Sequence, residues 1–272
     1  MSSFSRWLVL AALPALGACA AMPGAEAPPA AAAASDAYAG TSVLDAAIKA
    51  AGGEAALRQA KELAWTGSAT VNAGGKTTEI AMDTIVRPFT YARSTSWPKA
   101  DGPKAARTIQ AEGGHAWQIT RVSWMPMPEA EAAHENQQFA LYGVMTLVSL
   151  KDAGVKVTET APGKDGTRNL HVEHPKAPPM DLRFDASGRL VRIADSVRDP
   201  KGGAAPIPQV VEFTGEMISN GVKWPKHISI RQNDAPYFDL ELAKFEARPA
   251  FTNTPIPHTL DDARQPSGAD AG

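Results

Sequence analysis

Two short patterns in the sequence have residue types and spacings that are associated with catalysis or metal binding. Ser96 and Lys99 have the Ser-x-x-Lys spacing of penicillin-binding enzymes, in which the serine begins a helix and the lysine lies one turn away. Pro98 lies between them and interrupts any helix, and neither Ser-Asp-Asn nor Lys-Thr-Gly follows. We therefore interpret this stretch as the end of a strand.

The second pattern, residues 171–174, contains three possible metal ligands. Successive side chains of a strand point to opposite faces, so His171 and Glu173 share one face and His174 lies on the other. A zinc site usually has three or more protein ligands, which this arrangement does not bring together. The sequence also lacks Gly-x-Ser-x-Gly, His-Glu-x-x-His and glycine-rich phosphate-binding motifs. We expect no catalytic residue, no metal site and no cofactor.

The most specific chemistry belongs to Cys19, the single cysteine among 272 residues. It ends a leucine–glycine–alanine–cysteine sequence over residues 16–19, behind Arg6 and an apolar run over residues 7–13. This run is shorter than the about 20 residues that span a bilayer, and small residues after such a run are typical of cleaved export signals. The sequence matches the lipobox of bacterial lipoproteins, so we expect acylation of the thiol, with palmitate as a typical chain. The alternative is an ordinary signal peptide cleaved after Ala20.

This interpretation predicts a lipoprotein signal peptide over residues 1–18 and an alanine- and proline-rich tether over residues 19–41 that carries the lipidated cysteine. A folded domain over residues 42–251 and a flexible tail over residues 252–272 follow. In lipoproteins of Gram-negative bacteria, aspartate after the cysteine retains the protein at the inner membrane. Ala20 stands there, which favours a lipid anchor in the outer membrane, facing the periplasm.

Composition limits the partners of the domain. The 27 lysines and arginines nearly balance the 29 aspartates and glutamates, so no basic excess favours binding to nucleic acid. Charged residues make up 21% and hydrophobic residues 44% of the chain, as in ordinary globular domains. Once Cys19 is acylated, the domain has no thiol for a disulfide or a cysteine-ligated zinc ion.

Strands alternating with short turns dominate the pattern of the domain. Two short helices are expected at residues 43–50 and 54–60, after which apolar and polar residues alternate from Leu63 to Val71. Polar outer faces and short turns predict antiparallel meanders rather than βαβ units. Further strands are expected at residues 76–86, 89–97, 105–112, 115–124, 155–160, 168–174, 180–184, 189–197, 208–217, 222–232 and 237–247.

One helix, predicted over residues 129–151, interrupts the strands. Apolar side chains cover nearly the whole circumference of its second half, which must therefore be buried on most sides. A single sheet folded around this helix would bury it, and a helix laid across one sheet face is the alternative. The predicted fold class is mainly β (α+β), with a strongly curved antiparallel sheet, or incomplete β-barrel, and helices packed on its concave side.

The segment before this helix, residues 122–128, contains a tryptophan, two methionines and two prolines. Adaptable apolar side chains of this kind often line binding sites, although they also cover the ends of hydrophobic cores. Trp65, Trp97 and Trp117 lie on predicted strands and are expected to face the interior.

Three phrases of the sequence resemble those of the periplasmic lipoprotein carrier (LolA-like) superfamily. They are Gly-Glu-Ala-Ala-Leu at residues 53–57 followed by Trp-Thr-Gly at 65–67, Phe-Asp-Ala-Ser-Gly-Arg-Leu at 184–190, and Gly-Val-Lys-Trp-Pro at 221–225. The resemblance covers about residues 42–251 and implies an incomplete, strongly curved barrel with helices on its concave side. Members of this superfamily bind acyl chains, other lipids or lipoproteins, or act as sensors of envelope stress.

The resemblance leads to two functional hypotheses for an anchored protein that does not shuttle. The first is a non-catalytic envelope lipoprotein that binds a lipid, an acyl chain or another apolar ligand in the half-barrel. Its candidate contacts are Trp65, Trp117, Trp124, Met125, Phe139, Tyr142 and Met145. The second is a scaffold or stress-sensor module that binds another envelope protein and has no free cavity for a ligand.

Overall fold

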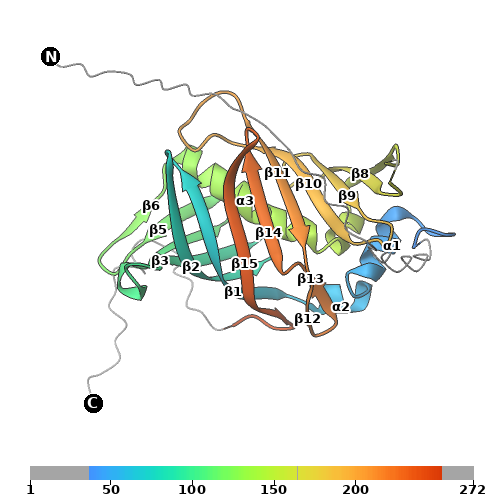
Figure 1. Ribbon diagram of the computed structural model, residues 1–272, viewed down its shortest axis with the longest axis horizontal. Helices are drawn as coiled ribbons and strands as arrows, with labels where there is room; N and C mark the ends of the chain where they lie inside the picture. The colour runs from blue at the N-terminus through green and yellow to red at the C-terminus, as the bar shows by residue number, and fades with distance from the viewer. Residues whose placement is uncertain (1–36, 164, 253–272) are drawn as a thin grey trace, which may run out of the picture. The chain divides into compact units, whose positions relative to one another are not determined.

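Figure 1 shows the protein as a computed structural model, in which residues 37–163 and 165–252 are described. The predicted signal peptide, Cys19 and nearly all of the predicted tether lie outside the described residues, and so do residues 253–272 of the predicted tail. Among the described residues, no helix is long and apolar enough to cross a membrane.

Two short helices precede the first strand, as the sequence predicts. Helix α1 (Val43–Ala50) is capped by Ser42, whose hydroxyl accepts a hydrogen bond of 3.1 Å from the Asp45 backbone N–H. Helix α2 is Glu54–Gln59. Between them, Gly52 has a φ of 118°, and a Cβ at this position would lie 2.0 Å from the Gly221 carbonyl oxygen. Only glycine therefore allows the helix pair to approach this later segment of the chain.

The described residues form one antiparallel sheet of 13 strands, in the order β6-β5-β4-β3-β2-β1-β15-β14-β11-β10-β9-β8-β7, and a separate two-stranded ribbon of β12 and β13. The strands are β1 (Glu62–Ala73), β2 (Lys76–Arg87), β3 (Tyr91–Pro98), β4 (Arg107–Glu112), β5 (His115–Ile119), β6 (Trp124–Pro126), β7 (Lys156–Thr160), β8 (Arg168–Glu173), β9 (Met180–Phe184), β10 (Leu190–Val197), β11 (Ile207–Thr214), β12 (Met217–Ser219), β13 (Val222–Trp224), β14 (His227–Gln232) and β15 (Ala235–Arg248). Strands β6 and β7 are the two edges, so within this part of the chain the sheet does not close.

The pairing of β1 with β15 joins the two halves of the sheet. Its register places Trp65 opposite Phe245, and a bulge follows at Thr66 and Gly67. A Cβ at Gly67 would lie 2.5 Å from the Glu241 carbonyl oxygen, so glycine permits the close approach of the two backbones at the bulge. Bulges increase local twist, which helps a long sheet to curve.

Helix α3 (Glu129–Met145) lies against the sheet and contacts β2, β4 and β5 from one half and β10 from the other. Because these strands are far apart in the strand order, the sheet must curve around the helix (Figure 1). The predicted fold class is confirmed: the sheet is antiparallel, open and curved, with a helix on its concave side.

Several predicted boundaries were wrong. The helix predicted to reach residue 151 ends at Met145, because Leu147 has a φ of 60° and the chain continues as a 3-10 turn, η2 (Val148–Lys151). Another 3-10 turn, η1 (Pro103–Ala105), precedes β4. The strands predicted over residues 115–124, 208–217 and 222–232 are each divided in two by turns, which short windows of alternating residues do not reveal.

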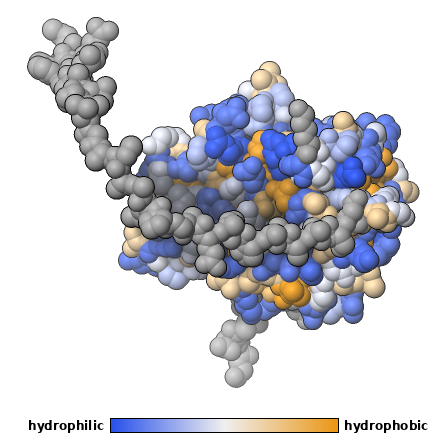
Figure 2. All heavy atoms as spheres, turned by 45° about the vertical axis from the view of Figure 1, so that its right-hand side comes forward, coloured by the Kyte–Doolittle hydropathy of each residue, from blue (hydrophilic) through white to orange (hydrophobic). Residues whose placement is uncertain are grey.

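The main core lies between α3, α1 and the concave face of the sheet. All six residues from Ala140 to Met145 are buried, which confirms the burial predicted for the second half of the helix. In the first half of α3 only Ala132 and His134 are buried. On the face turned forward in Figure 2, hydrophobic surface is limited to patches between hydrophilic side chains.

Candidate functional site

A row of aromatic side chains lies beneath α3, and we call it the aromatic row. The Phe139 and Tyr142 rings of α3 are 6.5 Å apart, and the Tyr142 ring is 4.7 Å from Trp65 of β1. The Trp65 ring is 6.4 Å from Trp224 of β13, which stacks on Phe245 of β15 at 5.4 Å. The indole N–H groups of Trp65 and Trp224 are buried and have no hydrogen-bond partner among the described residues.

The structure brings together four of the seven predicted ligand contacts. Trp65, Phe139 and Tyr142 belong to the aromatic row, and Met145 follows one turn further along α3. Trp65 is only 2% exposed, and Phe139 is half-buried.

The other three predicted contacts lie on β5 and β6. Ala116 packs against Ala132 of α3, so the neighbouring Trp117 points to the opposite, outer face of the sheet. Trp124 lies opposite Ile119, two residues after Trp117, and therefore shares that outer face. Met125 is 52% exposed.

The expectation that Trp97 and Trp117 face the interior was wrong, whereas it was correct for Trp65. Trp97 pairs with Ala81, next to the core residue Met82, and so also points outward. Alternation reveals that two residues share a face, but not which face the helix covers.

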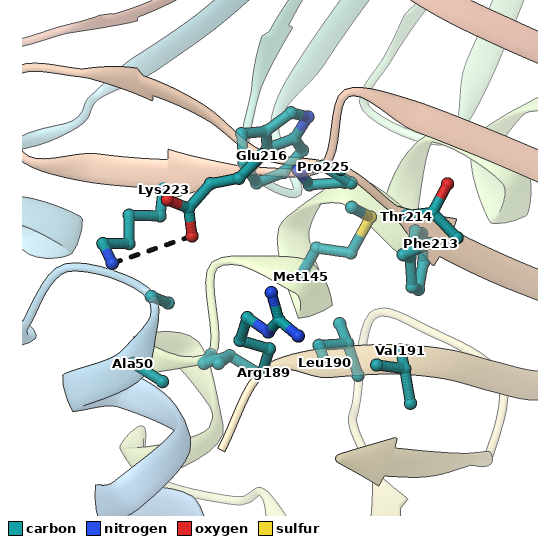
Figure 3. A pocket seen from close by; sticks show the side chains of 14 residues that line it. Ala50, Met145, Arg189, Leu190, Val191, Phe213, Thr214, Glu216, Lys223 and Pro225 are labelled. Atoms are coloured by element: carbon teal, nitrogen blue, oxygen red, sulfur yellow. Dashed lines mark ion pairs between the residues drawn. The ribbon is translucent and has the colours of Figure 1, made fainter. Parts of the chain in front are cut away.

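Figure 3 shows a pocket at the end of the core beside α1, which we call the α1 pocket. It has a volume of about 260 Å³ and is lined by Met145, Phe213 and Trp224. Lys223 and Glu216 form an ion pair of 3.7 Å at its edge. Arg189 also lines this pocket and is paired with Asp185 at 2.8 Å.

A second pocket, which we call the α3 pocket, lies between α3 and the concave face of β2, β3 and β4. Its volume is about 400 Å³. Small side chains make this room, because Ala92, Ala111 and Ala140 line the pocket together with Phe139. Of the seven predicted ligand contacts, only Phe139 lines this pocket, whereas Met145 lines the α1 pocket.

Phe89, in the turn between β2 and β3, lines the α3 pocket. Its φ is 58°, a left-handed conformation that is rare for a bulky residue. The ring stacks on His174 at 4.2 Å and lies against α3 at Gly143, where a Cβ would be 2.7 Å from the ring. Gly143 therefore provides the space for the Phe89 ring.

On the other side of Phe89 lies a third pocket of about 390 Å³, which we call the basic pocket. Its lining contains Arg58, Lys61, Arg87 and Lys176, whereas the only carboxylate among the described lining residues is Asp152. The sequence analysis missed this site, because its four cations come from three separate segments of the chain and no local charge run marks it.

A buried cluster of charged side chains lies next to the basic pocket. Glu62 is fully buried and accepts hydrogen bonds from Arg87 (3.1 Å), Arg248 (3.0 Å) and the Thr252 hydroxyl (2.8 Å). Burial acts to raise the pKa of Glu62, but these hydrogen bonds outweigh it and hold the pKa below its ordinary value. The Arg87 guanidinium also lies 4.4 Å from the centre of the Phe251 ring.

Two carboxyl groups near the first half of α3 have raised pKa values. Burial raises the pKa of Glu135 to about 7, with repulsion from Glu131 adding to the effect. Burial also raises the pKa of Asp195 on β10 to about 6, although a hydrogen bond of 3.2 Å from Gln209 opposes the shift. Gln209 also accepts a hydrogen bond of 2.8 Å from Gln138, which links α3 to the sheet.

The two sequence patterns considered for chemistry form no common site. Ser96 lies on β3, and Lys99, just after that strand, pairs with Glu79 at 3.6 Å. His171 hydrogen-bonds Asp181 at 2.7 Å, Glu173 pairs with Lys156 at 2.9 Å, and His174 stacks on Phe89. No group of three or more His, Cys, Asp or Glu residues within the described part of the chain is arranged to hold a metal ion.

No family model and no curated protein matches the sequence. Among solved structures, the chain is similar to a DUF1329 family protein from Desulfovibrio piger, with 10% identity, a TM-score of 0.50, and coverage of 75% of this chain and 91% of that one. It is also similar to a LolA superfamily protein from Nitrosomonas europaea, with 10% identity, a TM-score of 0.48, and coverage of 71% of this chain and 92% of that one. The likeness to the DUF1329 family protein agrees with the expected fold class, an open curved antiparallel sheet around a helix. Identities this low show the fold alone.

Proposed function

We propose that this protein is a non-catalytic binding protein of the cell envelope that holds an acyl chain or another apolar ligand between α3 and the sheet. The observation that carries this proposal is the α3 pocket. It is a partly open cleft between the helix and the concave face, and its volume of about 400 Å³ lies within the roughly 300–1,000 Å³ of small-molecule sites.

One part of the lining of the α3 pocket suits a hydrocarbon chain, whereas Arg87, Asn136 and Lys176 make another part polar. Ala92, Ala111 and Ala140 leave space without presenting polar groups, and Phe139 adds a half-buried aromatic surface. Each methylene group removed from water contributes about 0.8 kcal/mol, so roughly eight of them would contribute about 6 kcal/mol before the cost of association.

The predicted lipobox indicates where in the cell this binding would take place. Acylation of Cys19 would anchor the domain at the outer membrane, facing the periplasm, through the tether over residues 19–41. An anchored binding protein acts as a local receptor or acceptor for a lipid or lipoprotein acyl chain, because it cannot diffuse across the periplasm. Expression with radiolabelled palmitate, compared with Cys19→Ser, tests the anchor separately from the pocket.

The binding proposal is tested by filling the pocket. Ala140→Leu places three additional carbon atoms in the α3 pocket, whereas Ala130→Leu changes the same helix outside that lining. We expect the wild type and Ala130→Leu to bind a fluorescent fatty acid and to carry acyl chains from membranes, detected by mass spectrometry, and Ala140→Leu to lose both. Equal binding by the two variants would place any bound lipid outside the α3 pocket, and no binding by the wild type would refute the function.

A second candidate function is a scaffold or stress sensor that binds another envelope protein. The observation that favours it is the segment beside edge strand β6, where Val122 is 94% and Met125 is 52% exposed. A photocrosslinker at residue 122 in intact cells would capture one dominant protein if this segment binds a partner. A crosslinker at exposed Lys76, at the far end of β2, serves as the control position. Equal, diffuse labelling from both positions would argue against this function.

A further inference from the structure

We infer that the ligand is an anionic amphiphile, whose charged head occupies the basic pocket and whose hydrocarbon chain passes Phe89 into the α3 pocket. This inference rests on the proposed function and names the chemical class of its ligand. It follows from three features that adjoin one another: a cationic pocket, an apolar pocket and the aromatic side chain between them.

The basic pocket has positive charge that carboxylates of the protein do not compensate. Arg58 is paired with Glu54 at 2.8 Å and more loosely with Asp152 at 3.5 Å, and Arg87 is held by Glu62. In contrast, Lys61 and Lys176 are exposed and have no ion pair with any carboxylate in the described part of the chain. Two free ammonium groups at the mouth of one pocket attract a phosphate or carboxylate head.

The same pocket has an apolar side, which a free inorganic anion would not use. Leu57, Pro88, Val148 and Phe251 line it together with Phe89. A ligand with a charged group at one end and hydrocarbon at the other matches both parts of this lining.

The basic pocket and the α3 pocket share four lining residues, Arg87, Phe89, Thr90 and Lys176. Lys176 can therefore contact the head of a ligand whose chain enters the α3 pocket. Phe89 lies at this junction with a left-handed backbone conformation that is unfavourable for a bulky residue. The Phe89 ring, which lies against Gly143 and His174, would have to move for a ligand to extend from one pocket into the other.

Calorimetric titration of the full-length protein with dodecyl phosphate, dodecanol and inorganic phosphate, each below its aggregation concentration, tests this inference. We expect one dodecyl phosphate per protein, bound about tenfold more tightly than dodecanol, and no binding of inorganic phosphate. The double variant Lys61→Gln/Lys176→Gln should bind dodecyl phosphate no more tightly than dodecanol. The control Lys76→Gln/Lys104→Gln removes two exposed lysines without ion pairs elsewhere on the surface and should match the wild type.

The outcomes separate this inference from the proposed function. Equal affinities for dodecyl phosphate and dodecanol, unaffected by the lysine variants, would overturn the anionic head and leave the acyl-binding function standing. Binding of inorganic phosphate without either amphiphile, an adventitious ion only, would overturn both. Laurate binding as tightly as dodecyl phosphate would identify a carboxylate head as sufficient. Phe89→Ala should accelerate association of dodecyl phosphate, measured by stopped flow, and an unchanged rate would refute the role of Phe89 as the barrier.

Discussion

Replacement of Glu135 by glutamine should change the pH dependence of stability in a defined direction. Glu135 lies on the first half of α3. Burial raises the pKa values of Tyr142 and Tyr237, and the charge of Glu135 adds to both shifts. Burial raises its own pKa from an ordinary value of 4.5 to about 7. The folded state therefore holds a proton that the unfolded chain has released, and folding stability falls as the pH rises from about 4.5 to about 7.

The shift of about 2.5 pKa units corresponds to roughly 3 kcal/mol at about 1.36 kcal/mol per unit. Partial contact of the side chain with solvent reduces this value, so we expect an effect of about 1–3 kcal/mol. Because glutamine has the size of the protonated acid and never ionises, Glu135→Gln should match the wild type near pH 4.5 and exceed its stability above pH 7.

The free energy of unfolding would be measured by urea denaturation, followed by tryptophan fluorescence, at pH 5, 6, 7 and 8. Glu129→Gln is the matched control, because Glu129 is an exposed glutamate in the first turn of the same helix. In Glu135→Gln the free energy of unfolding still falls with rising pH, but less steeply, because Asp195 remains and burial raises its pKa to about 6. A pH profile of Glu135→Gln that runs parallel to those of the wild type and Glu129→Gln would refute the reasoning.

The remaining predictions concern packing and buried charge. Gly143→Ala should destabilise the wild-type protein by about 1–2 kcal/mol, because the added Cβ meets the Phe89 ring. In the Phe89→Ala variant, the same substitution should stabilise the protein by up to about 1 kcal/mol, because alanine has a higher helix propensity than glycine. A double-mutant cycle of urea unfolding tests this, and additive effects of the two substitutions would contradict it. Glu62→Gln should cost about 3–5 kcal/mol, because it leaves Arg87 without its carboxylate and Arg248 with Glu246 alone, and a large fall in thermal midpoint would show this. Because its pKa is lowered, the contribution of Glu62 should also disappear as the pH falls below about 4.5, and acid unfolding midpoints of the wild type and variant check this. Gly52→Ala should prevent stable docking of α1 and α2, because its Cβ would overlap the Gly221 backbone. The control Gly74→Ala, at a turn with open space, should lower the free energy of unfolding much less. Equal losses of stability in the two variants would refute this explanation.

Much of the local structure could be predicted because it is encoded over short distances. The alternation from Leu63 to Val71 gives a strand with one apolar face, and the turn residues separate neighbouring strands of the meanders. The apolar circumference over residues 140–145 correctly predicts that this part of α3 is buried. For the candidate site, the same signals identified Trp65, Phe139 and Tyr142, which form three members of the aromatic row.

Other features depend on which strands lie beside which, and local patterns do not contain that information. Trp117 and Trp97 alternate as Trp65 does, yet they face outward, because α3 covers the face that carries Ala116 and Met82. The break at Leu147 likewise follows from a single backbone conformation that the apolar pattern does not reveal.

The sequence by itself determined the antiparallel strands, the buried helix and the lipobox expectation at Cys19, because each depends on residues that are neighbours in the chain. Only the tertiary structure decided where a ligand could bind. The basic pocket draws Lys61 from the start of β1 and Lys176 from the turn after β8, more than one hundred residues apart, and places Phe89 between them and the α3 pocket. The electrostatic potential at a pocket is the sum over nearby charged groups, whatever their separation along the chain. This site therefore exists only once the β1–β15 pairing and the docking of α3 have brought those segments together.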